Sequence, residues 1–188
     1  MRRYRPPELL ADHHDLTQFH CRSTEQTEWL RRYARQSAAT GTTRVFVVTE
    51  LHHHHRVVAY YAWCMAQLNT EAAPDRVRKG AGRYPQPVAL LARLGVDIDH
   101  EGAGLGIGML QDVFARLIEL SDDIGCRGLL VHAESAEARD FYIHLVPEFE
   151  PSPTDPLHLV SAYERHTPNA VGLIGVALVT RMVCQVRW

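Results

Sequence analysis

The four cysteines of this 188-residue chain show neither a pairing pattern nor a metal-binding pattern. Cys21, Cys64, Cys126 and Cys184 lie far apart, and no Cys-x-x-Cys occurs. The sequence therefore predicts no zinc site built on cysteine and no disulfide framework. Reduced cysteines fit a protein of the cytoplasm, which is the location we expect.

The chain also lacks a strong net charge and a long apolar segment. It has 20 basic and 22 acidic residues, so nucleic-acid binding would need a local basic patch. Its N-terminus has no apolar core or cleavage site of a secretion signal. The apolar run 171–179 is too short to span a bilayer, so we expect no membrane partner. A hydrophobic content of 46% favours one globular domain.

A strand, a glycine-rich turn and a helix form the central stretch of the sequence. The continuous apolar run 88–96 predicts a buried strand, and glycines follow at 102, 104, 106 and 108. Apolar residues then return at the spacing of a helix with one buried face: Met109, Leu110, Val113, Phe114, Leu117 and Leu120. Glycines at a helix N-terminus let an anion approach unpaired N–H groups, which indicates a diphosphate site. The alternative is a loop that uses glycine only for turning.

Two common phosphate-binding motifs do not fit these glycines. A dinucleotide-binding turn requires Gly-x-Gly-x-x-Gly within repeated strand–helix units, and no such units precede this stretch. A nucleoside-triphosphate loop requires Gly-Lys-Ser/Thr, which is absent. Any diphosphate bound here would therefore belong to another kind of ligand.

Before the central stretch, the pattern predicts an irregular segment and a helix. Pro6-Pro7 exclude a helix within residues 1–22. Ser23 and Gln26 have capping-box spacing and predict a helix that ends near Thr40-Gly41. Its expected inner face comprises Trp29, Leu30, Tyr33 and Ala34.

The runs 44–50 and 56–67 predict a β-hairpin whose connection, 51–55, contains four consecutive histidines. Histidines can bind a metal, but at the tip of a hairpin these would be flexible and point in different directions, and the connection itself contains no carboxylate or cysteine. We therefore expect a solvated loop and no metal site.

A polar connection over 69–87 carries four cations beside Tyr84: Arg76, Arg78, Lys79 and Arg83. Cations and an aromatic ring suit phosphate contacts and base stacking, whereas the simpler interpretation is a basic surface loop.

After the central helix, which Gly125 should end, the pattern predicts a strand at 128–133. A helix capped by Ser135 should follow, with one face formed by Ala138, Phe141, Tyr142 and Leu145. Prolines then force a loop before a last strand at 157–163.

Several of these segments resemble a known family. Glu101, Gly104 and Gly106 fall on the Gln/Arg-x-x-Gly-x-Gly/Ala turn that binds coenzyme A in the Gcn5-related N-acetyltransferases. Further segments, in order along residues 5–165, resemble the acetyltransferase toxins of bacterial toxin–antitoxin pairs: 12–21, 28–34, 43–48, 56–62, 91–97, 129–133, 141–142 and 151–157.

The resemblance implies an α/β (α+β) fold of the Gcn5-related N-acetyltransferase type over residues 1–165, with a divergent tail at 166–188. In that fold a mixed central sheet is flanked by helices, and parallel strands, here 88–96 and 128–133, splay apart around acetyl-CoA. The implied cofactor contacts are Leu94, Val96, Glu101, Gly102, Ala103, Gly104, Leu105, Gly106 and Ser135. Glu101 departs from the pattern, and its carboxylate should repel a diphosphate and weaken cofactor binding.

The resemblance also implies the catalytic residue. Tyr142, the tyrosine of Phe-Tyr, matches the family's general acid, although on the helix pattern alone it would be a core tyrosine. The N–H groups between Leu94 and Val96 are the expected oxyanion donors. The sequence shows no Cys–His or Ser–His–Asp arrangement that would form a covalent acyl-enzyme. We therefore expect the substrate amine to attack the thioester directly. Arg93 could contact substrate phosphate or simply cover a helix.

The implied substrate is the α-amine of aminoacyl-tRNA, whose acetylation blocks translation. Implied partners are a ribbon–helix–helix antitoxin, operator DNA reached only through that antitoxin, and a second copy of the chain in a homodimer. Two alternatives remain open. One is an acetyltransferase of small amines or protein N-termini, and the other is a weakly active protein that binds acyl-CoA and acts as a corepressor of its operon.

Overall fold

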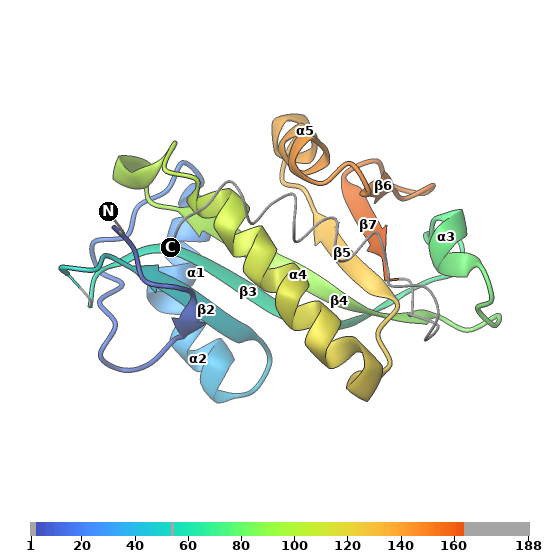
Figure 1. The fold of residues 1–188 in the computed structure, drawn as a ribbon, viewed down its shortest axis with the longest axis horizontal. Helices are drawn as coiled ribbons and strands as arrows, with labels where there is room; N and C mark the ends of the chain where they lie inside the picture. The colour runs from blue at the N-terminus through green and yellow to red at the C-terminus, as the bar shows by residue number, and fades with distance from the viewer. Residues whose placement is uncertain (1–2, 54, 164–188) are drawn as a thin grey trace. The chain divides into compact units, whose positions relative to one another are not determined.

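The structure is a computed structural model of the chain, and it describes residues 3–53 and 55–163 (Figure 1). The tail expected at 166–188 lies outside the described residues. The elements follow the chain in this order: β1 (Glu8–Leu9), α1 (Thr24–Arg32), α2 (Ala34–Ala39), β2 (Arg44–Thr49), β3 (Val57–Leu68), α3 (Asp75–Arg78), β4 (Gln86–Val96), the short 3₁₀ helix η1 (Ile98–His100), α4 (Leu105–Ile124), β5 (Gly128–His132), α5 (Ala136–Leu145), β6 (Glu150–Pro151) and β7 (His158–Ala162).

The strands form a mixed sheet in the order β1-β2-β3-β4-β5-β7-β6. Antiparallel pairing joins β1 to β2, β2 to β3, β5 to β7 and β7 to β6, whereas β4 and β5 are parallel. The parallel ladder pairs Ala89–Leu91 with Leu129–Val131. The predicted hairpin and the predicted parallel pair of strands are therefore confirmed.

The described chain divides into two compact units. The first comprises residues 3–64 and 92–113, and the second comprises residues 65–91 and 114–163. Strands β3 and β4 and helix α4 run from one unit into the other. Each unit has its own core.

The first unit packs helices on both faces of the β2–β3 hairpin (Figure 1). On one face, Leu30 and Ala34 are fully buried in a cluster with Val45, Val47 and Tyr60. On the other face, the Tyr61 hydroxyl donates a 2.5 Å hydrogen bond to the Asp112 carboxylate on α4. The period-2 alternation of the strands thus divides their side chains between two helical layers.

The helix predicted over 23–40 is interrupted at one residue, Tyr33. Ser23 caps α1 as predicted, by accepting a hydrogen bond from the Gln26 N–H, but α1 ends at Arg32 and α2 starts at Ala34. Tyr33, which was expected inside, is 53% exposed. Leu30 and Ala34, four residues apart, take the core positions, and the break at Tyr33 turns its side chain toward solvent.

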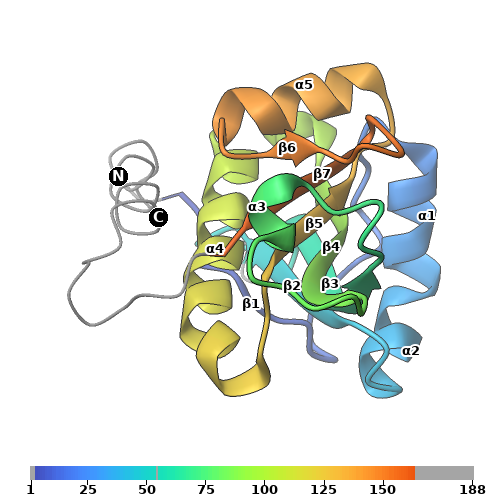
Figure 2. The same ribbon diagram turned by 90° about the vertical axis from the view of Figure 1, so that its right-hand side faces the viewer.

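The second unit contains the polar connection 69–87, which is not a plain loop. Residues 75–78 form α3, and Ala73 and Val77 are buried in a cluster with Leu68, Val88 and Val160. Two apolar side chains among many polar ones were too few to reveal this packing in the sequence. Helix α5 lies beside β6 in this unit (Figure 2).

Three further local predictions were wrong. Leu120 and Phe141, assigned to inner helix faces, are 42% and 41% exposed. Leu120 lies in the last turns of α4, while on α5 the neighbouring Tyr142 takes the buried position instead of Phe141. The irregular segment 1–22 contains a two-residue strand, β1, which pairs with β2. None of the helices in the described part of the chain combines the length and apolar character that crossing a membrane requires.

Gly128 provides a test of the β5–β7 pairing. A Cβ atom at this position would lie 2.4 Å from the Ser161 carbonyl oxygen, and the paired backbone of β7 cannot yield as a side chain could. We expect Gly128→Ala to lower the free energy of unfolding by about 1–3 kcal/mol in urea titrations. Gly82→Ala is the control, because its Cβ would meet only the Tyr84 ring at 3.7 Å. Equal stability of the two variants would contradict the packing described here.

Candidate active site

A buried carboxylate holds the turn between β4 and the glycines. Asp97 is 1% exposed, and its Oδ2 accepts a 2.9 Å hydrogen bond from the His20 N–H. Its Oδ1 accepts from the Asp99 N–H at 3.1 Å, and its own N–H donates to the Val58 carbonyl at 2.8 Å. These bonds fix the direction in which η1 leaves the strand. The sequence carries no signal of this role of Asp97, because a lone aspartate after a strand resembles an ordinary turn residue.

The glycine turn has a backbone that suits an anion. Gly102 and Gly104 have φ of +72° and +80°, in the region that favours glycine. The Gly104 carbonyl accepts from the Gly108 N–H at 3.0 Å, which starts the 20-residue helix α4. Buried Leu105 fixes the first turn of the helix in the core. The turn therefore presents the N–H groups of a long helix at its start, where a diphosphate would fit.

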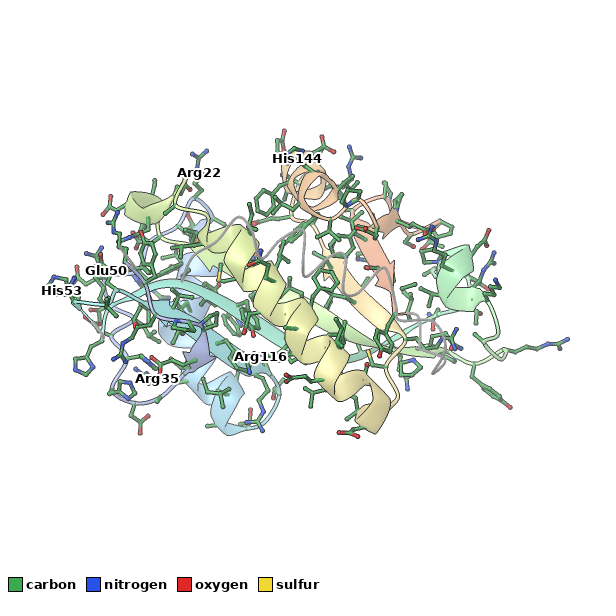
Figure 3. All side chains as sticks on the ribbon, viewed as in Figure 1. Arg22, Arg35, Glu50, His53, Arg116 and His144 are labelled. Carbon is green, nitrogen blue, oxygen red and sulfur yellow. The ribbon has the colours of Figure 1, made fainter. Side chains whose placement is uncertain are left out.

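Glu101 and Ala103, the two other members of the predicted loop, are exposed on either side of Gly102. The Glu101 carboxylate is bonded to Arg22 in a forked arrangement: Nε lies 2.8 and 3.0 Å from the two carboxylate oxygens, and Nη2 lies 2.7 Å from Oε2. The repulsion expected from Glu101 is therefore offset by a guanidinium. No local pattern in the sequence indicates this role of Arg22, because its partner lies 79 residues away. Its side chain projects from the surface in Figure 3.

Leu94 and Val96 are partly buried in the last part of β4. Arg93, on the same segment, donates to Glu25 at 2.9 Å, and its guanidinium lies 5.8 Å from the centre of the Trp29 ring. Arg93 thus covers helix α1, which is one of the two roles predicted for it from the sequence. Its contact with substrate phosphate stays a prediction.

Tyr142 lies on α5 with 9% of its surface exposed. Its ring packs edge-on against Phe141 and Phe149, with centroids 5.5 and 6.1 Å away. Burial raises the pKa of its hydroxyl well above the ordinary value, and the nearby negative charge of Glu134 adds to this effect. A phenol keeps its proton at neutral pH even at its ordinary pKa, so Tyr142 carries the proton that a general acid must donate.

Two other residues hold the Tyr142 segment. The Ser135 hydroxyl accepts from the Ala138 N–H at 3.2 Å and caps α5 as predicted, while its role toward the cofactor stays a prediction. Phe149, 3% exposed, packs between Phe114 and Tyr142. In the sequence, the only sign that Phe149 would pack against Tyr142 is that it is an apolar residue in a segment rich in proline.

The four cations predicted to contact RNA are exposed on the second unit, on α3 and the segment after it: Arg76, Arg78, Lys79 and Arg83. Arg76 pairs with Glu150 at 3.1 Å, and Arg78 pairs with Asp75. Arg127 donates to the Lys79 carbonyl at 2.8 Å and so holds the backbone of this segment. Arg83 lies beside Tyr84, which is 80% exposed.

Two groups of side chains in the described residues bring possible metal ligands together. They are Glu8, His13 and His14, and His132, Asp155 and His158. In the first group the Nδ1 of His14 accepts the Ala11 N–H at 2.9 Å, so its Nε2 carries the proton and is not available to a metal. The second group is partly exposed. Neither group contains a histidine of the connection 51–55.

Comparison with solved structures defines the class of the fold. A structure of AtaT complexed with acetyl-methionyl-tRNAfMet matches with a TM-score of 0.75 and 23% identity, over 82% of this chain and 92% of that one. A structure of an AtaT mutant toxin bound to the C-terminus of the antitoxin AtaR and acetyl-CoA matches with a TM-score of 0.69 and 21% identity, over 83% and 91%. The chain has the Gcn5-related N-acetyltransferase fold, as predicted.

Comparison of sequences defines the family. No profile of a known protein family matches the chain. A curated relative, the tRNA-acetylating toxin of Mycobacterium tuberculosis (strain ATCC 25618 / H37Rv), is 40% identical over 157 residues, which cover 84% of this chain and 91% of the toxin. The chain belongs to the family of tRNA-acetylating toxins.

Asp97 provides a test of how the turn is held. Asp97→Ala would leave the N–H groups of His20 and Asp99 without their acceptor. We expect the free energy of unfolding to fall by about 1–3 kcal/mol, measured by urea titration. Asp99→Ala is the control, because the Asp99 side chain is 77% exposed and should contribute within about 0.5 kcal/mol. A similar loss in both variants would show that the buried carboxylate has no special role.

His100, at the end of η1, should make stability depend on pH. It is 4% exposed and its Nδ1 lies 3.1 Å from the Tyr4 hydroxyl, and burial lowers its pKa below the ordinary 6.5. As pH falls below 6.5, the unfolded state takes up a proton that the folded state resists. We expect unfolding free energy to decrease from pH 7.5 to 5.5, by at most about 1.4 kcal/mol per pH unit from this residue.

His100→Gln should reduce this slope, measured as unfolding free energy across the same pH range. Exposed His53→Gln is the matched control and should keep the wild-type slope. An unchanged slope in His100→Gln would assign the pH dependence to other groups, such as buried His14, whose pKa burial also lowers.

Proposed function

We propose that this protein is a toxin that transfers the acetyl group of acetyl-CoA to the α-amine of an aminoacyl-tRNA and thereby blocks translation. The observation that carries the proposal is the 40% identity to a tRNA-acetylating toxin over 84% of the chain. The fold supports it, because AtaT, whose structure matches this one, has been solved with an acetylated aminoacyl-tRNA and with acetyl-CoA. The acetyltransferase domain comprises residues 1–165 in this proposal.

The glycine turn is the part of the chain that fits acetyl-CoA. Positive φ at Gly102 and Gly104 shapes the turn, and an added Cβ at Gly102 would meet no atom within 4 Å. We assign the diphosphate to the N–H groups of Gly102, Ala103, Gly104, Leu105 and Gly106. Leu94, Val96 and Ser135 are the further cofactor contacts in this assignment. Acetyl-CoA supplies an acyl group that is already activated as a thioester.

The chemistry assigned to the protein is orientation and proton transfer. The substrate amine forms the new carbon–nitrogen bond and releases a proton to water, while the carbon–sulfur bond breaks. A backbone N–H between Leu94 and Val96 donates to the oxygen that becomes negative. Tyr142 gives its proton to the departing sulfur and regains one from solvent, because its phenol carries a proton at neutral pH.

The acceptor and partners follow from the family. Arg76, Arg78, Lys79 and Arg83 are the proposed contacts to tRNA phosphates, with Arg93 as a further candidate, and exposed Tyr84 offers a stacking surface. AtaT is bound by its antitoxin AtaR in a solved structure. For this chain we propose a ribbon–helix–helix antitoxin that carries the pair to operator DNA, a homodimeric state and action in the cytoplasm.

Mass analysis of tRNA tests the reaction. Purified protein with acetyl-CoA and charged tRNA should add one acetyl group to the aminoacyl end, and free amines offered as competitors should remain unmodified. Acetylation of free amines or protein N-termini instead would favour the small-substrate alternative. No acetylation of any amine by a protein that binds acetyl-CoA would favour the corepressor alternative.

Tyr142→Phe tests the proton donor. The variant should fold and bind acetyl-CoA as the wild type does, because it loses only the hydroxyl oxygen, while turnover on charged tRNA should fall by roughly 100-fold or more. Tyr33→Phe, which removes an exposed hydroxyl on the other compact unit, is the matched control and should keep full activity. Wild-type turnover in Tyr142→Phe would remove Tyr142 from the mechanism.

A further inference from the structure

Glu101 presents an electrostatic problem that the glycine turn alone does not solve. Its carboxylate is adjacent to Gly102, at the start of a turn whose proposed ligand carries two or more negative charges. The loop offers no cation of its own, because residues 101–108 contain neither lysine nor arginine. Backbone N–H groups and the helix dipole would have to outweigh a fixed negative charge nearby.

Arg22 neutralises the negative charge of Glu101 beside the glycine turn. Its Nε and Nη2 hold both oxygens of Glu101 within 3.0 Å, so the pair is neutral overall and has a fixed geometry. The guanidinium has a third nitrogen, Nη1, which makes no hydrogen bond within the part of the chain that the structure describes. The Arg22 side chain is 80% exposed, so a ligand at the loop can reach it.

The backbone on both sides of the pair is held in place. Two residues before Arg22, the His20 N–H donates to Asp97 and the His20 carbonyl accepts from the Ile98 N–H at 2.8 Å. One residue after it, Ser23 caps α1. The segment that carries Arg22 is thus fixed to the same buried carboxylate that holds the turn before Glu101. This is more order than an exposed ion pair between two mobile loops would have.

We propose that Arg22, oriented by Glu101, binds a phosphate of the acyl-CoA and supplies the cation that the loop itself lacks. Glu101 is then a positioning residue, and its departure from the family pattern is balanced by a residue on another segment. The inference rests on the proposed use of acetyl-CoA but not on the identity of the acceptor amine.

Binding of two acyl carriers tests this role. Acetyl-CoA carries the phosphates, whereas S-acetylpantetheine keeps the thioester and lacks them. For Arg22→Gln we expect roughly tenfold weaker binding of acetyl-CoA by calorimetry and a smaller salt dependence of that binding, because a charge-assisted hydrogen bond is lost. Use of S-acetylpantetheine as acyl donor should not change.

Arg32→Gln is the matched control, because Arg32 also forms an exposed ion pair, with Glu28 at 3.5 Å on α1. It should bind acetyl-CoA like the wild type. The exchange Arg22→Glu with Glu101→Arg keeps the pair, places the cation on the loop as in the family pattern, and should restore most of the affinity. This double variant tests whether the charge near the turn is what matters.

Two results would overturn the inference. One is acetyl-CoA affinity within twofold of wild type in Arg22→Gln, which would leave the pair as a surface contact only. The other is an equal loss with both carriers, which would indicate a distorted site and no phosphate contact. Wild-type protein that binds acetyl-CoA but fails to acetylate tRNA would contradict the proposed function and leave the role of Arg22 standing.

Discussion

The candidate site depends on one buried carboxylate. Asp97 directly follows β4, its oxygens accept hydrogen bonds from the backbone N–H groups of His20 and Asp99, and it is 1% exposed. A carboxylate removed from water must find donors, and these donors lie on two segments far apart in sequence. Satisfying Asp97 therefore fixes the start of the glycine turn and the segment before α1 together.

The electrostatics of the turn follow from this constraint. Once the segment around His20 is held, Arg22 lies within 3.0 Å of Glu101, and a position that the family pattern gives to a polar or cationic side chain becomes an ion pair. A feature that looked unfavourable in the sequence is thus compensated within the first compact unit. In the second unit, burial, to which the ring contact with Phe149 contributes, and the charge of Glu134 raise the pKa of the Tyr142 phenol.

Much of the fold could be predicted from local patterns, and the errors have physical causes. The hairpin, the parallel strands, the caps at Ser23 and Ser135 and the helix end at Gly125 each depend on residues close in sequence. Tyr33, Leu120 and Phe141 were placed wrongly because helical spacing allows several faces, and only tertiary packing selects the buried one. Helix α3 was not predicted, because a helix of four residues shows almost no hydrophobic periodicity.

The sequence by itself determined the strand–glycine–helix stretch, the position of Tyr142 and the family, since these depend on order and spacing along the chain. The tertiary structure alone decided the partners of Asp97, Glu101 and Arg93, because hydrogen bonds and ion pairs between distant segments leave no spacing signal in one sequence. It also decided that Tyr142 is buried and that its pKa is raised, since burial and neighbouring charge shift a pKa and neither can be read from the order of residues.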